Sequence, residues 1–169
     1  MRTSKAIRAR LRAAKTLSSG GELKDSKVSL CIYSEHIDIA KLTALIGRKP
    51  THAQVKGQIR RPPHGRGPAT LGHWFLAAPQ RLGFEDKVQY LLDATPNSSA
   101  IWRRIEKAHD VQLRCGVFMH SFNEGFELPA ETAAQIGKRK WKLLVDIYGA
   151  EGAEVLEAFL KPAIQARGR

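Results

Sequence analysis

Cysteine is scarce in this chain of 169 residues, which contains only Cys31 and Cys115. Neither has a second cysteine or a histidine at the spacing of a zinc ligand pair, so a structural zinc site has little support. Both lie in apolar, strand-like runs, which predicts buried free thiols in a reducing compartment. A disulfide between neighbouring strands is still open at this stage.

Long apolar runs are also missing. No run approaches the ~18 residues that cross a bilayer, and no apolar signal-peptide core follows the basic N-terminus. We therefore expect no transmembrane segment and a cytoplasmic location. The composition, 43% hydrophobic and 26% charged, is typical of a globular protein, and the length favours one domain.

The sequence contains none of the common catalytic motifs. There is no G-x-x-x-x-G-K-[ST] or G-x-G-x-x-G phosphate-binding loop, no G-x-S-x-G nucleophile and no H-E-x-x-H zinc motif. The histidines stand singly, without the spacing of metal ligands: His36, His52, His64, His73, His109 and His120. The sequence thus predicts no metal and no cofactor, and it leans against an enzyme, although residues that meet only in the fold leave that question open.

Acidic residues are too few to balance the basic ones, since 28 Lys and Arg face 16 Asp and Glu for a net charge of +12. Residues 1–27 carry +6, residues 48–66 carry +6 without any acid, and residues 161–169 carry +3. The remainder has a charge of −3. The excess thus lies in two termini and one loop, as expected of solvated segments rather than of one folded binding face.

We expect residues 1–27 to form a basic, disordered leader, because the apolar stripe there is thin and a Ser-Ser-Gly-Gly joint follows it. A basic amphipathic helix that touches lipid or RNA phosphates, a transit segment and a start assigned too far upstream are the alternatives. Residues 28–149 form the predicted domain, and residues 150–169 a C-terminal helix and basic tail.

Alternating and helical patterns follow one another through the domain. Asp38 and Gly47 are the expected caps of the first helix. Strands are expected at 28–34, 51–57 (a short edge strand), 73–78, 111–120 and 141–148; helices at 38–47, 84–94, about 99–109, 129–137 and 151–165; and a loop at 58–68.

This order predicts an α+β fold. It matches a ferredoxin-like split βαβ arrangement, an antiparallel sheet with helices on one face, extended by an extra C-terminal strand and helix.

Several blocks resemble a small bacterial family of uncharacterised proteins, domain of unknown function 4279. They are residues 38–57, the lone Gly72-His73-Trp74, residues 110–119 and residues 125–149. The resemblance covers roughly residues 28–149 and implies a cytoplasmic α+β domain without an assigned activity. Some members of such families are discussed as immunity proteins of bacterial toxin systems, so an immunity role is one expectation.

Candidate binding residues gather on the polar side of the predicted sheet and on the basic loop. Asp146 is a carboxylate within an apolar strand, and an ion pair with Arg114 is favoured over a role as general base. Trp74 is favoured as a core residue over a ligand-stacking one. The full set is Tyr33, Arg60, Arg61, Arg66, Trp74, Arg114, Phe118, His120, Asp146 and Tyr148.

These observations favour a non-catalytic binding module that engages another protein through the open sheet face or the basic loop. An immunity-like or regulatory role is its most concrete form. The alternative is binding of RNA or other single-stranded nucleic acid, because sheet aromatics can stack on bases while arginines contact phosphates. The basic leader and loop would add to such binding.

Overall fold

A computed structural model describes residues 21–60, 67–121 and 123–149 of the protein. The strands are β1 (Gly21–Glu22), β2 (Asp25–Ser34), β3 (His52–Gln54), β4 (Ile59–Arg60), β5 (Gly67–Pro68), β6 (Gly72–Ala77), β7 (Asp110–Phe118), β8 (Glu124–Gly125) and β9 (Lys142–Tyr148). The helices are α2 (Ile39–Ile46), α3 (Phe84–Asp93), α4 (Ser99–Glu106) and α5 (Ala130–Lys138).

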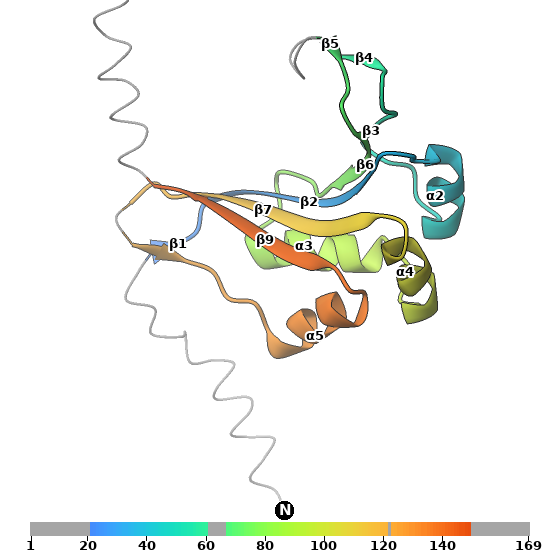
Figure 1. The fold of residues 1–169 in the computed structure, drawn as a ribbon. Helices are drawn as coiled ribbons and strands as arrows, with labels where there is room; N and C mark the ends of the chain where they lie inside the picture. Colours follow the sequence, from blue (N-terminus) through green and yellow to red (C-terminus); the bar gives the residue numbers. More distant parts are fainter. Residues whose placement is uncertain (1–20, 61–66, 122, 150–169) are drawn as a thin grey trace, which may run out of the picture.

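Five strands form the main sheet in the order β3-β6-β2-β7-β9 (Figure 1). The first four are antiparallel to their neighbours. The last strand, β9, runs parallel to β7, because the chain returns through α5 as a crossover. The α+β class is therefore confirmed, but the sheet is mixed, which corrects the prediction of an antiparallel one.

The helices lie on one face of this sheet, and the core lies between the two layers (Figure 1). Alternation on β2 and β7 places one row of each strand in that core, and cross-strand pairs such as Leu30 with Leu113 join the rows. The most buried side chains of this layer include Val28, Leu30, Ile32, Trp74, Leu91, Trp102, Ile105 and Leu113.

The first helix, α2, begins and ends as its sequence predicts. The Asp38 carboxylate accepts a hydrogen bond of 2.9 Å from the backbone N–H of Lys41, which satisfies one free donor of the first turn. Gly47 ends the helix with φ +72°, a left-handed conformation that a residue without a Cβ adopts at little cost.

A buried lysine ties α3 to the sheet. Lys87 is 2% exposed, and its Nζ donates to the carbonyl of Ser26 at 2.6 Å and to the hydroxyl of the same residue at 3.1 Å. Burial lowers the pKa of Lys87, while Asp25 opposes that change. The two acceptors compensate for the lost hydration of the ammonium group and make a fixed joint between helix and strand.

Several segments differ from the sequence prediction: β3 covers only His52–Gln54 of the expected strand 51–57, and α4 ends at Glu106. The expected loop at 58–68 contains the short antiparallel pair β4 and β5, although residues 61–66 lie outside the described residues. β7 ends at Phe118 rather than at His120. Two strands lie partly or wholly within the expected leader, since β1 covers Gly21–Glu22 and pairs with β8, and β2 begins at Asp25. The rest of that leader and the predicted C-terminal helix lie outside the described residues.

Candidate functional site: the open face of the sheet

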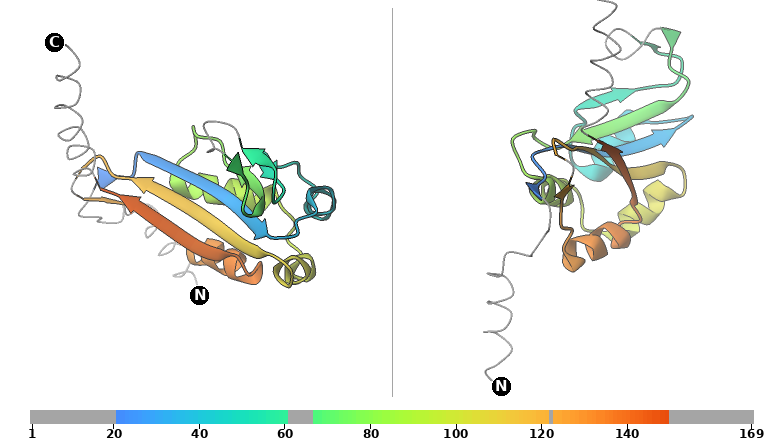
Figure 2. Two further views of the ribbon diagram at one scale, coloured as in Figure 1. Left: turned by 45° about the horizontal axis from the view of Figure 1, so that its top comes forward. Right: turned by 90° about the vertical axis from the view of Figure 1, so that its left-hand side faces the viewer.

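The face of the main sheet opposite the helices is here called the open face. The left view of Figure 2 shows more of this face than Figure 1 does, with β9 as one of the two edge strands. Strand register determines which side chains belong to it: Tyr33 and Cys31 on β2 share it with Arg114 on β7 and with Asp146 on β9. All Asp, Glu, Lys and Arg side chains of the five strands project to this face, because the other face of the sheet packs in the core.

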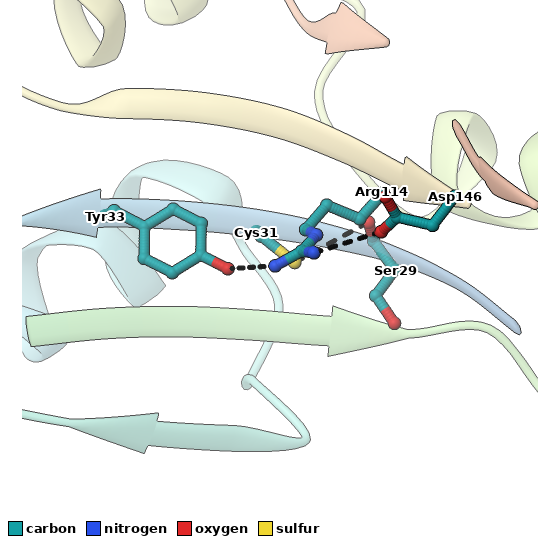
Figure 3. Close-up of polar contacts among 5 residues, drawn as sticks. All are labelled: Ser29, Cys31, Tyr33, Arg114 and Asp146. Atoms are coloured by element: carbon teal, nitrogen blue, oxygen red, sulfur yellow. Dashed lines mark hydrogen bonds and ion pairs between the residues drawn. The ribbon is translucent and has the colours of Figure 1, made fainter. Parts of the chain in front are cut away.

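Three strands meet in a hydrogen-bonded centre, which Figure 3 shows. A terminal nitrogen of Arg114 donates to the Tyr33 hydroxyl at 3.3 Å, and the other contacts the Asp146 carboxylate at 3.2 Å. The predicted ion pair is therefore confirmed, and its partners are 44% and 43% exposed. The hydrogen bond from Arg114 to Tyr33 holds the pKa of that guanidinium above its ordinary value. The guanidinium of Arg114 is therefore held in place by two partners, stays charged, and is still accessible to water.

Cys31 lies beneath this centre. Its side chain belongs to the open face by register but is only 3% exposed. The Sγ atom is 3.8 Å from the carbonyl of Ser29, and burial raises the pKa of the thiol to about 11. Burial also raises the pKa of Tyr33. Both groups are therefore neutral at physiological pH, and the thiol is unsuited to nucleophilic attack.

An aromatic cluster lies on the side of the open face formed by β3, β6 and β2. The rings of His73 and Phe75 are stacked at 4.0 Å, and Tyr33 meets Phe75 edge-on at 5.3 Å. Nδ1 of His52 and Nε2 of His73 are 2.7 Å apart, so one ring donates a hydrogen bond to the other. Isolated in sequence, these histidines become neighbours because β3 and β6 pair.

A second aromatic pair lies at the opposite end of the face. Phe118 and Tyr148 stack at 4.9 Å with 9° between their planes, and the ammonium of Lys27 lies 5.4 Å from the Phe118 ring centre. Tyr148 is 53% exposed. Parallel register between β7 and β9 places these two rings directly opposite each other.

Opposite charges balance on this face. Lys27, Arg114 and Lys142 project from the strands together with Asp25, Asp110 and Asp146. Lys142 contacts Asp110 at 2.6 Å, and this hydrogen bond holds the pKa of Asp110 below its usual range. A shallow depression of about 480 Å³ lies between Leu71, Tyr33, Gln112 and Arg114. The face therefore offers aromatic and paired polar groups rather than a field of one sign.

Several predicted site residues lie elsewhere. Trp74 is fully buried on the core side of β6, where its Nε1 donates to the Thr43 hydroxyl at 3.2 Å, so it is not part of the open face. His120 follows the end of β7, and its backbone N–H donates to Glu124. Arg60 lies on β4, in the pair that projects from the body of the fold in Figure 1. Arg61 and Arg66 lie outside the described residues.

His52, His73 and Phe75 were missed as site residues. Alternation along β6 predicts that His73 and Phe75 project to the other face of the sheet from the core residue Trp74. The strands that pair with β6, and hence the neighbours of these two rings, could not be predicted from the sequence. Within residues 21–60, 67–121 and 123–149, no group of three or more His, Cys, Asp or Glu side chains could hold a metal ion. In the same residues, no helix is long and apolar enough to cross a membrane.

Fold and site together define a small α+β domain with one covered and one open sheet face. The sequence matches the family described as Domain of unknown function (DUF4279) over residues 23–150, and the chain belongs to that family. No curated protein and no solved structure matches the chain.

Proposed function

We propose that this protein is a non-catalytic binding module whose open face engages another protein. The observation that carries this proposal is the arrangement of the face itself: a hydrogen-bonded Tyr33–Arg114–Asp146 centre lies between two aromatic groups, beside a shallow depression of about 480 Å³. Tyrosine and arginine are among the residues that most often dominate protein interfaces, because each combines a large contact area with directional polar groups.

Charge balance favours a protein partner over a nucleic acid. Phosphate binding needs unpaired positive charge, whereas Arg114 and Lys142 each contact a carboxylate. An immunity-like or regulatory role in a bacterial cytoplasm is the concrete form that we propose. The two free, buried thiols suit a reducing compartment of this kind.

The test begins with affinity capture from native lysate and continues with the purified partner. We expect Arg114→Ala and Tyr148→Ala each to weaken binding of that partner about tenfold or more. Arg103→Ala is the matched control, because Arg103 is an exposed arginine on α4, on the helix side of the sheet. Equal affinities for wild type, Arg114→Ala and Tyr148→Ala would exclude the open face as the binding surface.

Single-stranded nucleic acid is the second candidate ligand. The stacked Phe118 and Tyr148 rings beside Lys27 support it, since exposed aromatics on a sheet can stack on unpaired bases. For RNA, affinity should fall steeply between about 50 and 200 mM salt, and Tyr148→Ala should weaken it further. Affinity that does not change with salt would exclude this candidate.

We also propose that the fold is a variant of the ferredoxin-like split βαβ arrangement. Strand order β3-β6-β2-β7, with every neighbour antiparallel, supports this assignment. The additions are the second helix between β6 and β7 and the parallel strand β9.

A further inference from the structure

The two edges of the main sheet differ in kind. β3 forms one edge with only three residues, each partly buried. β9 forms the other with seven residues, and within the described residues no strand pairs with its outer side. Four apolar side chains of β9 are exposed: Leu143 47%, Leu144 38%, Ile147 63% and Tyr148 53%. Proteins protect such edges by brevity, proline or charge, and β9 has little of this protection.

Backbone groups of β9 point alternately to β7 and outward. Since the N–H of Met119 donates to the carbonyl of Tyr148 at 2.9 Å, the backbone of Tyr148 faces β7. The backbone alternates with a period of two, so the N–H and C=O groups of Leu143, Val145 and Ile147 face away from the sheet. The backbone groups of these three residues can therefore form hydrogen bonds with a further strand.

We propose that this edge pairs with β9 of a second copy of the chain, antiparallel, about a two-fold axis through Val145. In this register Val145 lies opposite its own counterpart, and Leu143 lies opposite Ile147 of the second copy. All three outward-facing residues then form hydrogen-bonded pairs with the second copy. In such an interface the same strand of each copy forms the contact, as two-fold symmetry requires.

The side chains of β9 are self-complementary in this register. Leu143, Val145 and Ile147 project to the helix side, so the pairing makes a continuous apolar row across both copies. On the open face, Lys142 lies opposite Tyr148 of the second copy and diagonal to its Asp146, so opposite charges become neighbours across the interface. The one like-charge diagonal joins the two Asp146 carboxylates, each of which contacts Arg114 of its own chain at 3.2 Å. A shift by two residues would place Gly149 opposite Leu143, or Trp141 opposite Ile147, and would break the Leu–Ile pairs.

The pairing would unite the sheets of both copies. An axis normal to the sheet keeps the same face upward in each copy, so the two open faces would lie on one side of the dimer. The dimer would then present two identical surfaces to a partner.

Sedimentation equilibrium of the full chain tests the pairing. We expect a monomer–dimer equilibrium, in which Ile147→Lys raises the dimer dissociation constant about tenfold or more. Ile59→Lys is the matched control, because Ile59 is the same residue type at 66% exposure but lies on β4. Ile59→Lys should leave the equilibrium unchanged, and circular dichroism should show that both variants are folded.

Disulfide trapping tests the register. Paired Val145 residues would have Cα atoms about 5.5 Å apart, a distance that a disulfide can bridge. We therefore expect Val145→Cys to give a crosslinked dimer under mild oxidation. Ile147→Cys is the control in the same strand, since its two copies would lie about 13 Å apart at ~3.3 Å per residue.

Three results would overturn the proposal. A wild-type chain that stays monomeric at all concentrations would show that β9 does not pair with a second copy. A dimer that Ile147→Lys leaves intact would place the contact elsewhere. Crosslinking of Ile147→Cys as fast as that of Val145→Cys would exclude the two-fold register.

Discussion

Cys31 and Cys115 belong to opposite faces of the same sheet. Cys31 lies opposite Gln112 and faces the open side, whereas Cys115 lies opposite Val28 and faces the core. Because side chains alternate across a strand, two cysteines in these positions cannot form a disulfide. Both are free and buried, as the apolar runs around them predict. Strand register thus excludes the disulfide between Cys31 and Cys115 that the sequence alone left open.

Thiol labelling provides the prediction at this scale. Burial raises the pKa of Cys31 to about 11 and that of Cys115 to about 12, and the thiolate is the reactive form. We expect no reaction of the folded protein with an aromatic disulfide reagent at neutral pH, and reaction of both thiols in denaturant. Rapid labelling of the native Cys31→Ser variant would contradict the burial of Cys115, and rapid labelling of Cys115→Ser that of Cys31.

Among the secondary-structure elements, β6 explains why Gly72 and Trp74 stand two residues apart. Trp74 projects into the core, and Gly72, two residues earlier, faces the same side. A Cβ on Gly72 would overlap the side chain of Ile37 and come within 3.0 Å of the Ser34 carbonyl. The glycine is therefore required by the close approach of the chain before α2, and the tryptophan by the core that α2 covers.

A double-mutant cycle tests this close approach. We expect Gly72→Ala to lower the free energy of unfolding by about 1–3 kcal/mol, because the surrounding groups must move. In an Ile37→Ala background the same change should cost less, since the side chain that it meets is shortened. Denaturant unfolding measures each step.

Gly137→Ala is the control for this cycle. Gly137 is in α5, where an added Cβ meets nothing within 4 Å, so alanine should stabilise the protein by up to about 1 kcal/mol. Additive effects of Gly72→Ala and Ile37→Ala would show that the two residues do not interact.

For the whole molecule, the charge of +12 and the open face are separate features. The strands of the main sheet carry equal numbers of acidic and basic side chains. Of the total charge, +8 lies in residues 1–20 and 61–66, which are outside the described residues. We therefore expect nonspecific attraction to anions to depend mainly on those residues, separately from the proposed binding through the open face.

Neutralised variants of the full chain test this separation. Changing Arg8, Arg10 and Arg12 to Gln should reduce the salt dependence of single-stranded RNA binding by about 2 in the slope of log K against log salt, at ~0.7 per contact. The matched control changes Arg103, Arg104 and Lys107 to Gln, which removes the same charge from exposed positions in and just after α4. An equal decrease in both variants would place anion binding on the folded domain.

Much of the fold could be predicted because its signals are local. The cores of β2, β6, β7 and β9 follow from alternation, and α2 and α3 from helical spacing. The α2 caps at Asp38 and Gly47 follow from residue chemistry that acts within a few positions. The pair β4 and β5 was not predicted, because each strand has only two residues and the Gly and Pro in and around the pair indicate a loop.

The sequence alone determined the α+β class, the core position of Trp74, the partition of charge and the family. Strand neighbours and directions depended on the packed molecule, because pairing joins residues far apart in the chain and alternation does not record which strands meet. This is why the parallel pairing of β9, the contact between His52 and His73 and the Arg114 centre emerged only with the tertiary structure.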